Sequence, residues 1–170
     1  GIDGFEGEHW APRLQRHSGG NPLFVLETML ALLREPRTAD ALPLPQNLGS
    51  LIEQRLALLS PGALKLARVA AVAGDEFSLE LAAQATQTTV LDLTDPWREL
   101  TQAHVLSEQG FAHDVIREGV LRGLPAPIAQ WIHAAVAAFV ETHGAVHARA
   151  AFHWRSAGEM QRAAAAYLLA

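Results

Sequence analysis

The feature that most constrains the fold of this chain is ALKLARVAAVAG, residues 63–74, which is apolar on most sides when wound as a helix. A helix of this kind has to be buried on most sides, so other elements must surround it. Ser60 and Pro61 precede it as a cap and a first helical residue, and Gly74 ends it. We therefore expect a mainly α fold with this helix at its centre.

Apolar periodicity predicts further helices on both sides of the central one. They are expected at residues 6–18, 22–34, 46–59 and 77–85, then within 88–103, and later at about 114–123 and 127–142. The helix within 88–103 either starts near Thr88 or is broken by Pro96. Ile128, Ile132, Val136 and Val140 lie in register along one face of the helix at 127–142.

One short segment departs from the helical pattern. HVLSEQGFAHD, residues 104–114, pairs two extended runs around Glu108-Gln109-Gly110 and predicts a β-hairpin. Three helices followed by a hairpin is the order of elements in a winged helix. The tail, from residue 145 onward, predicts two antiparallel helices with a turn at Gly158, which is how a helical-repeat array would begin.

Composition narrows the function classes. The chain has 170 residues, 49% hydrophobic and 18% charged, which is typical of a globular protein. A formal net charge of −5 argues against a nucleic acid as a general partner. The sequence has no cysteine, which excludes a disulfide or a Cys-ligated metal and is compatible with the cytoplasm. No long uncharged apolar run or signal-peptide pattern occurs, so we expect a cytoplasmic protein with no membrane contact.

The lysine content excludes one class of phosphate site. Lys65 is the only lysine, and it lies in PGALKLA, away from any glycine-rich loop. A P-loop places its lysine directly after G-x-x-x-x-G, so this chain is not a complete P-loop NTPase. Because it begins at Gly1 and ends within the helical pattern RAAAAYLLA, we expect it to be a piece of a larger protein.

Metal and nucleophile chemistry find little support. His143 and His147 are four residues apart and His153 follows, but Gly144 lies between the first two and no carboxylate completes a ligand set. We therefore expect no metal site. No nucleophile-elbow motif surrounds the serines in caps and turns, namely Ser18, Ser60 and Ser107. No catalytic residues are predicted, and the chain by itself is not expected to be an enzyme.

Three stretches, in this order and spacing, carry a resemblance to a known family. SGGNPLFVLE at 18–27 resembles the glycine-x-proline motif of the signal-transduction ATPases with numerous domains, a branch of the AAA-like NTPases. The segment LPQNLGSLIEQRLALLSPGALKLARVAAVAGDEFSLELA resembles the segment after that motif in the large LuxR-type and maltose-regulator-type bacterial activators. FAHDVIREGVLRGLPAPIAQWIHAAVAAFVE matches their F-x-H-D-x-[IV]-R-E stretch. The tail resembles the opening of their tetratricopeptide-like array.

The resemblance implies three segments. Residues 1–44 would be the helical lid of an ATPase module, and residues 45–113 a winged-helix domain of three helices and a small hairpin. Residues 114–170 would be a helical linker and the start of a repeat array. The core with the phosphate loop would lie upstream in the same chain and would be the direct partner of this piece. ATP or ADP with Mg²⁺ would be a ligand of the parent protein, and the piece alone would hold no cofactor.

The resemblance also implies nucleotide contacts that need the missing core. In such ATPases the proline of the first motif lies against the nucleotide base, which assigns that contact to Pro22, with Gly20 and Asn21 letting the backbone approach closely. The alternative is a plain capped helix start. His113 would reach the β-phosphate of ADP, or else bond only to local backbone, and Asp114 would cap the following helix.

The function expected from these features is regulatory. The chain would close over nucleotide held by the core and pass its state to the repeats, for transcriptional control, with an inducer or partner protein on the repeats. One alternative is a DNA-binding winged helix. Residues 88–113 oppose it, because they hold Arg98 alone against Asp92, Asp95, Glu99 and Glu108. The other alternative is a helical-repeat scaffold, which the absence of a hairpin near 104–113 would favour.

Overall fold

The computed structural model describes Val25 and residues 48–108, 110–143 and 147–170. The helix predicted at 6–18 lies outside these residues, as does all of the helix predicted at 22–34 except Val25, which is helical. The chain divides into two compact units, Gly1–Ile52 and Glu53–Ala170, and α3 (Leu48–Ala57) contains residues of both. The second unit carries the central apolar helix and the hairpin segment, and it is described by itself.

The described part of the chain is mainly α-helical and carries one small antiparallel sheet. After α3 come α4 (Pro61–Ala73), η1 (Gly74–Glu76), α5 (Leu79–Thr86), η2 (Leu91–Leu93), α6 (Thr94–Gln102), β1 (Leu106–Ser107), β2 (Gly110–Phe111), α7 (Asp114–Arg122), α8 (Ala126–Thr142), α9 (His147–Ser156) and α10 (Met160–Leu168). The mainly α class is confirmed. The predicted hairpin forms too, with Leu106 opposite Phe111 and Ser107 opposite Gly110.

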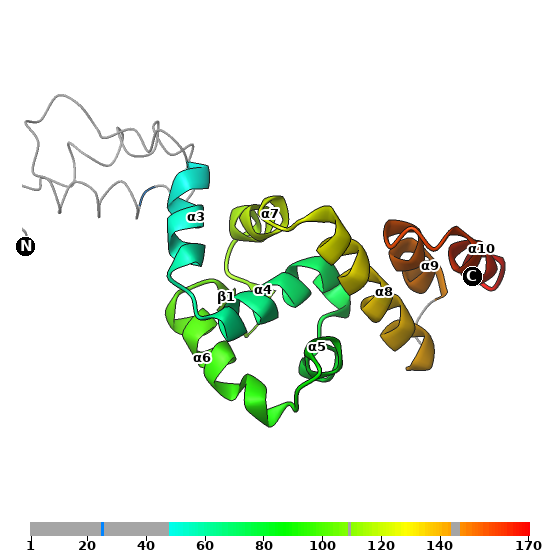
Figure 1. The fold of residues 1–170 in the computed structure, drawn as a ribbon, viewed down its shortest axis with the longest axis horizontal. Coiled ribbons are helices and arrows are strands. Elements are labelled where there is room, and N and C mark those ends of the chain that lie inside the picture. Colours follow the sequence, from blue (N-terminus) through cyan, green and yellow to red (C-terminus); the bar gives the residue numbers. More distant parts are fainter. Residues whose placement is uncertain (1–24, 26–47, 109, 144–146) are drawn as a thin grey trace, which may run out of the picture. The chain divides into compact units, whose positions relative to one another are not determined.

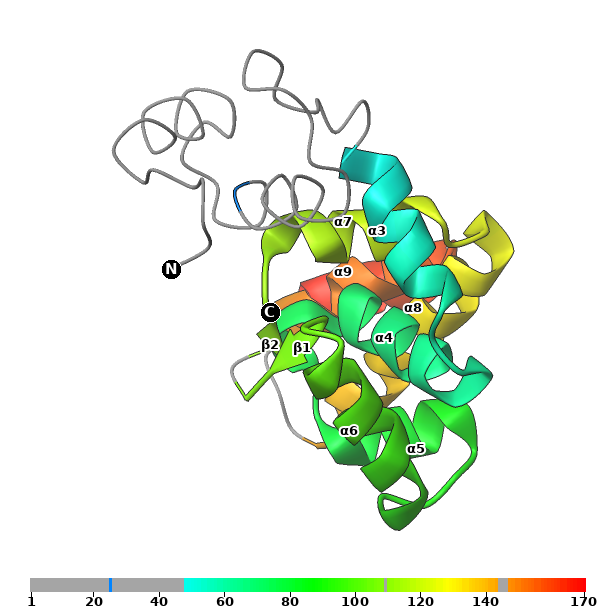
Figure 2. The ribbon, with the colours of Figure 1, turned by 90° about the vertical axis from the view of Figure 1, so that its left-hand side faces the viewer.

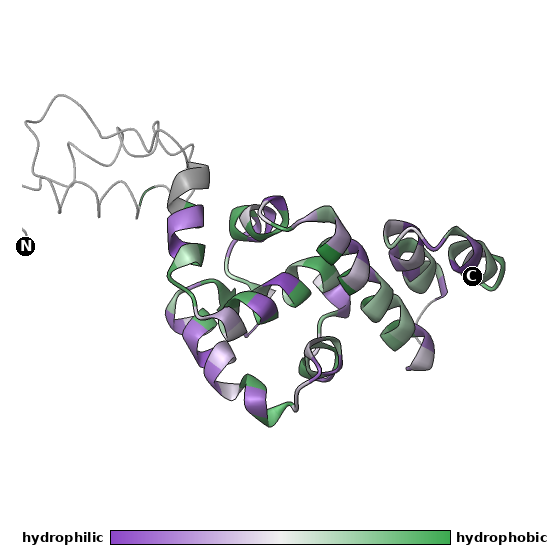
Figure 3. Ribbon diagram, in the orientation of Figure 1, coloured by the Kyte–Doolittle hydropathy of each residue, from purple (hydrophilic) through white to green (hydrophobic). Residues whose placement is uncertain are grey.

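Helix α4 lies at the centre of the second unit, as its apolar sequence predicts. It packs against α5, α6, α7 and α8, and Figures 1 and 2 show it between them. Leu66 and Ala67 are fully buried on it, and α4 and α8 are more hydrophobic than α6 in Figure 3. The Ser60 hydroxyl accepts the Ala63 N–H at 3.2 Å, and Gly74 ends the helix at φ 59°.

The helix expected within 88–103 forms differently from both predicted versions. A 3-10 turn at Leu91–Leu93 comes first, and α6 begins only at Thr94, so Pro96 lies in its first turn. Proline is tolerated there because first-turn N–H groups have no intrahelical acceptor. Pro96 therefore lies in the first turn of α6 and does not break the helix. Glu99 of α6 accepts the Ser60 N–H and hydroxyl, each at 2.6 Å, and so ties α6 to the start of α4.

The last helices pack side by side. Helix α9 packs against both α8 and α10, and the chain turns at Gly158, where φ is +87°. The turn predicted there is confirmed. Along α8 the predicted stripe is buried at Ile132, Val136 and Val140, whereas Ile128 is 47% exposed. No single described helix has the length and hydropathy to cross a bilayer. Helices α7 and α8 meet both criteria only when taken together, and a bend of 119° separates them.

Candidate functional site

The residues singled out in the sequence are only partly described. Gly20, Asn21 and Pro22 lie outside the described ranges. His113 is half-buried at the start of α7 with extended backbone, φ −151° and ψ 141°. It occupies the cap position, so the cap expected at Asp114 falls one residue earlier. Asp114 already has a helical position in the first turn, where its carboxylate still faces the positive end of the helix dipole.

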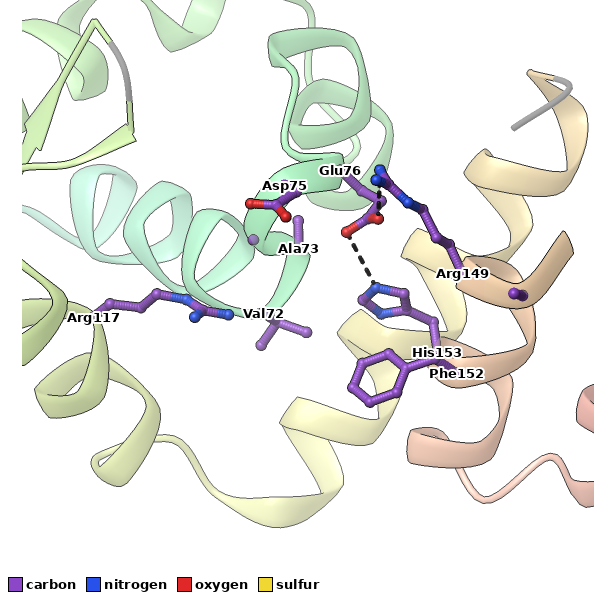
Figure 4. Close-up of a pocket in the computed structure, with 10 residues that line it drawn as sticks. Val72, Ala73, Asp75, Glu76, Arg117, Arg149, Phe152 and His153 are labelled. Carbon is purple, nitrogen blue, oxygen red and sulfur yellow. Dashed lines mark ion pairs between the residues drawn. The ribbon is translucent and has the colours of Figure 1, made fainter. Parts of the chain in front are cut away.

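A polar junction surrounds the turn that follows α4. A cavity of about 340 Å³ lies there, between η1, Arg117 of α7 and the face of α9 that carries Arg149 and His153. Figure 4 shows Arg117 reaching in from one side and Arg149, Phe152 and His153 from the other, with Asp75 and Glu76 between them. The cavity therefore collects acidic, basic and imidazole groups from three elements that are distant in sequence.

Glu76 is the centre of this junction, which we call the Glu76 joint; it comprises Glu76, Arg149, His153 and His133. One carboxylate oxygen, Oε1, lies 3.1 Å from Nη1 of Arg149, and the other, Oε2, lies 3.7 Å from Nε2 of His153. The Glu76 side chain is 14% exposed and that of His153 only 3%, so this contact is largely screened from water. At 3.7 Å the imidazole contact is electrostatic and too long for a hydrogen bond.

A second imidazole extends the joint into α8. Nδ1 of His133 lies 2.8 Å from Nδ1 of His153. If the Nε2–H of His153 faces the Glu76 carboxylate, its Nδ1 is unprotonated and accepts a hydrogen bond from the Nδ1–H of His133. One added proton fits, because a charged His153 donates from Nδ1 to His133 while the Glu76 carboxylate attracts its positive charge. A second proton would bring two N–H groups together at 2.8 Å, so the pair holds one imidazolium at most.

The environment of both rings favours the neutral form. Burial, and then the neighbouring His153, lower the pKa of His133 from 6.5 to about 4. Burial also lowers the pKa of His153, and the Glu76 carboxylate partly offsets this by favouring the imidazolium. At neutral pH the joint therefore holds a salt bridge between Glu76 and Arg149 and two neutral, hydrogen-bonded imidazoles.

This arrangement predicts a pH-dependent stability. Between pH 6.5 and 4 the unfolded chain binds a proton that folded His133 excludes, so the free energy of unfolding rises with pH across that window. A shift of this size on a fully buried group corresponds to about 3 kcal/mol, and solvent screening of a half-buried ring reduces it to about 1–2 kcal/mol. Urea unfolding at pH 7 and pH 4 measures the loss.

A matched pair of variants isolates that titration. His133→Gln removes the depressed imidazole and should flatten the pH profile between 6.5 and 4. His147→Gln changes an exposed histidine at the start of α9 and should leave the profile as it is. Equal slopes in the two variants would show that carboxylates elsewhere cause the acid loss.

Arg117 fixes the other wall of the cavity. Its Nε donates to the Ala71 carbonyl at 2.9 Å and so ties α7 to the last turn of α4. A Cβ placed on Gly74 would lie 3.2 Å from Nη2 of Arg117, and the φ of Gly74 is +59°. Both observations favour glycine at position 74. Sequence reasoning found the glycine as a helix stop and missed the arginine that packs on it.

The Glu76 joint was not predicted as a unit. The sequence pattern suggests His153 only as one of three histidines in a possible metal-ligand set that lacks a carboxylate. It gives no sign of a role for Glu76, Arg149 or His133. Among the described residues no group of three or more His, Asp or Glu side chains is placed to hold a metal ion. Comparison of the chain with protein families, curated proteins and solved structures finds no match.

Proposed function

We propose that this chain is the coupling section of a nucleotide-dependent signal-transduction ATPase, a cytoplasmic bacterial transcription regulator. In this proposal residues 1–44 belong to the lid, 45–113 form a winged helix, and 114–170 begin a tetratricopeptide-like array. The order of elements supports it: helices α4 to α6, the β1–β2 hairpin, and then helices α7 to α10. The nucleotide part of the proposal rests on the family resemblance of the sequence motifs.

The observation that carries the coupling role is the Glu76 joint. Glu76 lies on the turn after α4, inside the three-helix-and-hairpin region, while Arg149 and His153 lie on α9 of the terminal stack. The Glu76 side chain is 14% exposed and that of Arg149 is 53% exposed, so moving Arg149 away would leave a mostly buried carboxylate without its partner, which is costly. Displacement of α9 relative to the turn after α4 therefore costs free energy, which suits an element that couples the two parts.

The terminal stack suits the receiving end of such coupling. Small side chains are buried on α9 and α10, which lets packed helices approach closely: Ala150, Ala151, Ala163 and Ala166. Trp154 of α9 joins the neighbours on both sides. In the parent protein, Gly20, Asn21, Pro22 and His113 would contact ATP or ADP bound with Mg²⁺ in the core, and an inducer or partner protein would act on the repeats.

The described contacts disfavour the two rival functions. A recognition helix needs free cations, and the only arginine of α6, Arg98, pairs with Asp95 at 2.9 Å. Glu99 stays anionic, because hydrogen bonds from the Ser60 hydroxyl and then the Ser60 N–H lower its pKa. The absence of a hairpin near 104–113 would have favoured the helical-repeat scaffold. Because β1 and β2 pair there, the scaffold loses that support.

Two titrations of this chain test the proposal. A fluorescence-anisotropy titration with random duplex DNA at physiological salt should show no binding, because the α6 surface offers no net positive charge to phosphates. Calorimetry with Mg-ATP should give a dissociation constant no tighter than about 1 mM, because the phosphates need the core. Salt-sensitive DNA binding near 10⁻⁶ M would favour the DNA-binding alternative, and micromolar ATP binding would contradict the need for a core.

A further inference from the structure

A second cavity, which we call the α4–α8 groove, lies where α4, α5 and α8 meet and has a volume of about 410 Å³. Its apolar side chains come from α4 and α8, and two cations from α4 stand beside them. The residues that matter here are Lys65, Arg68, Val69, Ile128, Trp131 and Ile132. The volume falls within the range of small-molecule sites, which is about 300–1,000 Å³.

The apolar part of the groove is built but only half covered. Val69 and Ile132 form a buried floor, at 2% and 3% exposure. Ile128 and Trp131, on the same face of α8, remain 47% and 52% exposed. An indole next to an apolar floor offers a large contact area to a ligand at little cost in conformational freedom. The groove therefore has an apolar surface that no other described element of this unit covers.

The two cations are the second observation. Lys65 and Arg68 are three residues apart on α4, so they project from neighbouring positions on one helix face. Neither has a hydrogen bond or an ion pair with any residue in the ranges 48–108, 110–143 and 147–170. Arg98 and Arg149, by contrast, pair with Asp95 and Glu76. In a chain of net charge −5, two such cations beside an apolar groove form a site of local positive charge.

Among the described hydrogen bonds, none runs from Lys65 or Arg68 to a carbonyl at the end of α5. The Thr86 hydroxyl donates to the Ala82 carbonyl at 2.7 Å. The N–H groups of Gln87 and Thr88 donate to the Gln84 and Ala83 carbonyls. The chain thus satisfies the Ala82, Ala83 and Gln84 carbonyls by itself, and none of these described bonds uses a Lys65 or Arg68 donor.

We propose that the α4–α8 groove binds a small amphiphilic anion, a carboxylate on an apolar body about the size of a medium-chain fatty acid. The apolar body lies against Val69, Ile132 and Trp131, and the carboxylate accepts from Lys65 and Arg68. None of the residues named for this groove belongs to the Glu76 joint. Binding in the groove does not depend on the proposed regulatory function.

Calorimetry with three ten-carbon probes tests the charge and the apolar body separately. Decanoate should bind with a dissociation constant on the order of 10⁻⁴ M, a modest affinity per ligand atom. Decan-1-ol, which has the same chain without the charge, should bind about tenfold more weakly, and decyltrimethylammonium should not bind measurably. Equal binding of the acid and the alcohol would overturn the carboxylate assignment.

Variants locate the site. Lys65→Met with Arg68→Met keeps the aliphatic stems and should weaken decanoate about tenfold with no effect on decan-1-ol. Trp131→Ala should weaken both probes. Arg98→Met, on exposed α6, is the matched control and should change neither. If the double variant lowers the melting temperature but leaves decanoate binding intact, the two cations serve only the α5 end and the proposal is wrong.

Analytical ultracentrifugation without any probe tests whether a second copy of the chain occupies the groove instead. The proposal expects no self-association that depends on the groove. If the chain self-associates and Trp131→Ala abolishes this, the groove is the interface with a second copy, and the small-anion proposal is overturned.

Discussion

Trp154→Ala should lower the free energy of unfolding by about 3–5 kcal/mol, the usual cost of deleting a buried indole. Trp154 is 2% exposed on α9. Its Nε1 donates to Oε1 of Glu141 on α8 at 2.6 Å, and the guanidinium of Arg162 on α10 lies 4.5 Å from its ring centroid. One side chain thus joins three helices, so its loss leaves a cavity and removes the contacts to Glu141 and Arg162, which are both exposed to solvent.

Urea unfolding followed by circular dichroism measures this effect. Trp131→Ala is the matched control, because Trp131 is 52% exposed on α8, and its loss should cost less than about 1 kcal/mol. Trp154→Phe should fall between the two, because it keeps most of the apolar volume and loses the hydrogen bond to Glu141. Similar costs for Trp154→Ala and Trp131→Ala would contradict the stacking of α8, α9 and α10 around Trp154.

His113→Ala in the protein that contains the nucleotide core should release ADP about ten- to a hundredfold faster and raise output without inducer. This prediction rests on the proposed ATPase role. A hydrogen bond from the imidazole to the charged β-phosphate is worth about 1.5–3 kcal/mol, and it would exist only in the closed state. A stopped-flow measurement of fluorescent ADP release gives the rate.

The isolated chain supplies the control for this variant. The His113 side chain makes no capping hydrogen bond to α7, so His113→Ala should barely change the melting temperature of the chain. Asp114→Ala, one residue on, removes a favourable first-turn charge worth about 0.3–1 kcal/mol and should leave ADP release unchanged. Unchanged ADP release together with strong destabilisation by His113→Ala would mean that His113 is only structural.

The elements that the sequence predicted correctly are those with local causes. Ser60 marks the start of α4 and Gly74 marks its end, because a cap hydroxyl and a positive-φ residue act within one turn of the chain. The β1–β2 hairpin and the turn at Gly158 follow from the same short-range chemistry. Pro96 was misjudged because proline breaks a helix interior and is accepted in a first turn, and the position of that turn was unknown.

The Glu76 joint could not be predicted, because its members share no local pattern. His133 and His153 lie on different helices, and Glu76 lies in a turn far earlier in the chain. A single histidine in a helical pattern gives no sign of whether it faces solvent, a carboxylate or a second imidazole. The exposure of Ile128 was hidden for a related reason: periodicity identifies an apolar face and does not tell how far the neighbouring helices cover it.

The sequence by itself determined the mainly α class, the central burial of α4 and the positions of the hairpin and of the α4 ends, because periodicity and capping act over a few residues. Only the tertiary structure decided which charges meet and which remain unpaired. The packing of α8 against α4, and of α9 on α8, brings Arg149 to Glu76, while the junction of α4, α5 and α8 leaves Lys65 and Arg68 beside an open apolar groove. Such partnerships depend on distances between elements remote in sequence, and packing alone sets those distances.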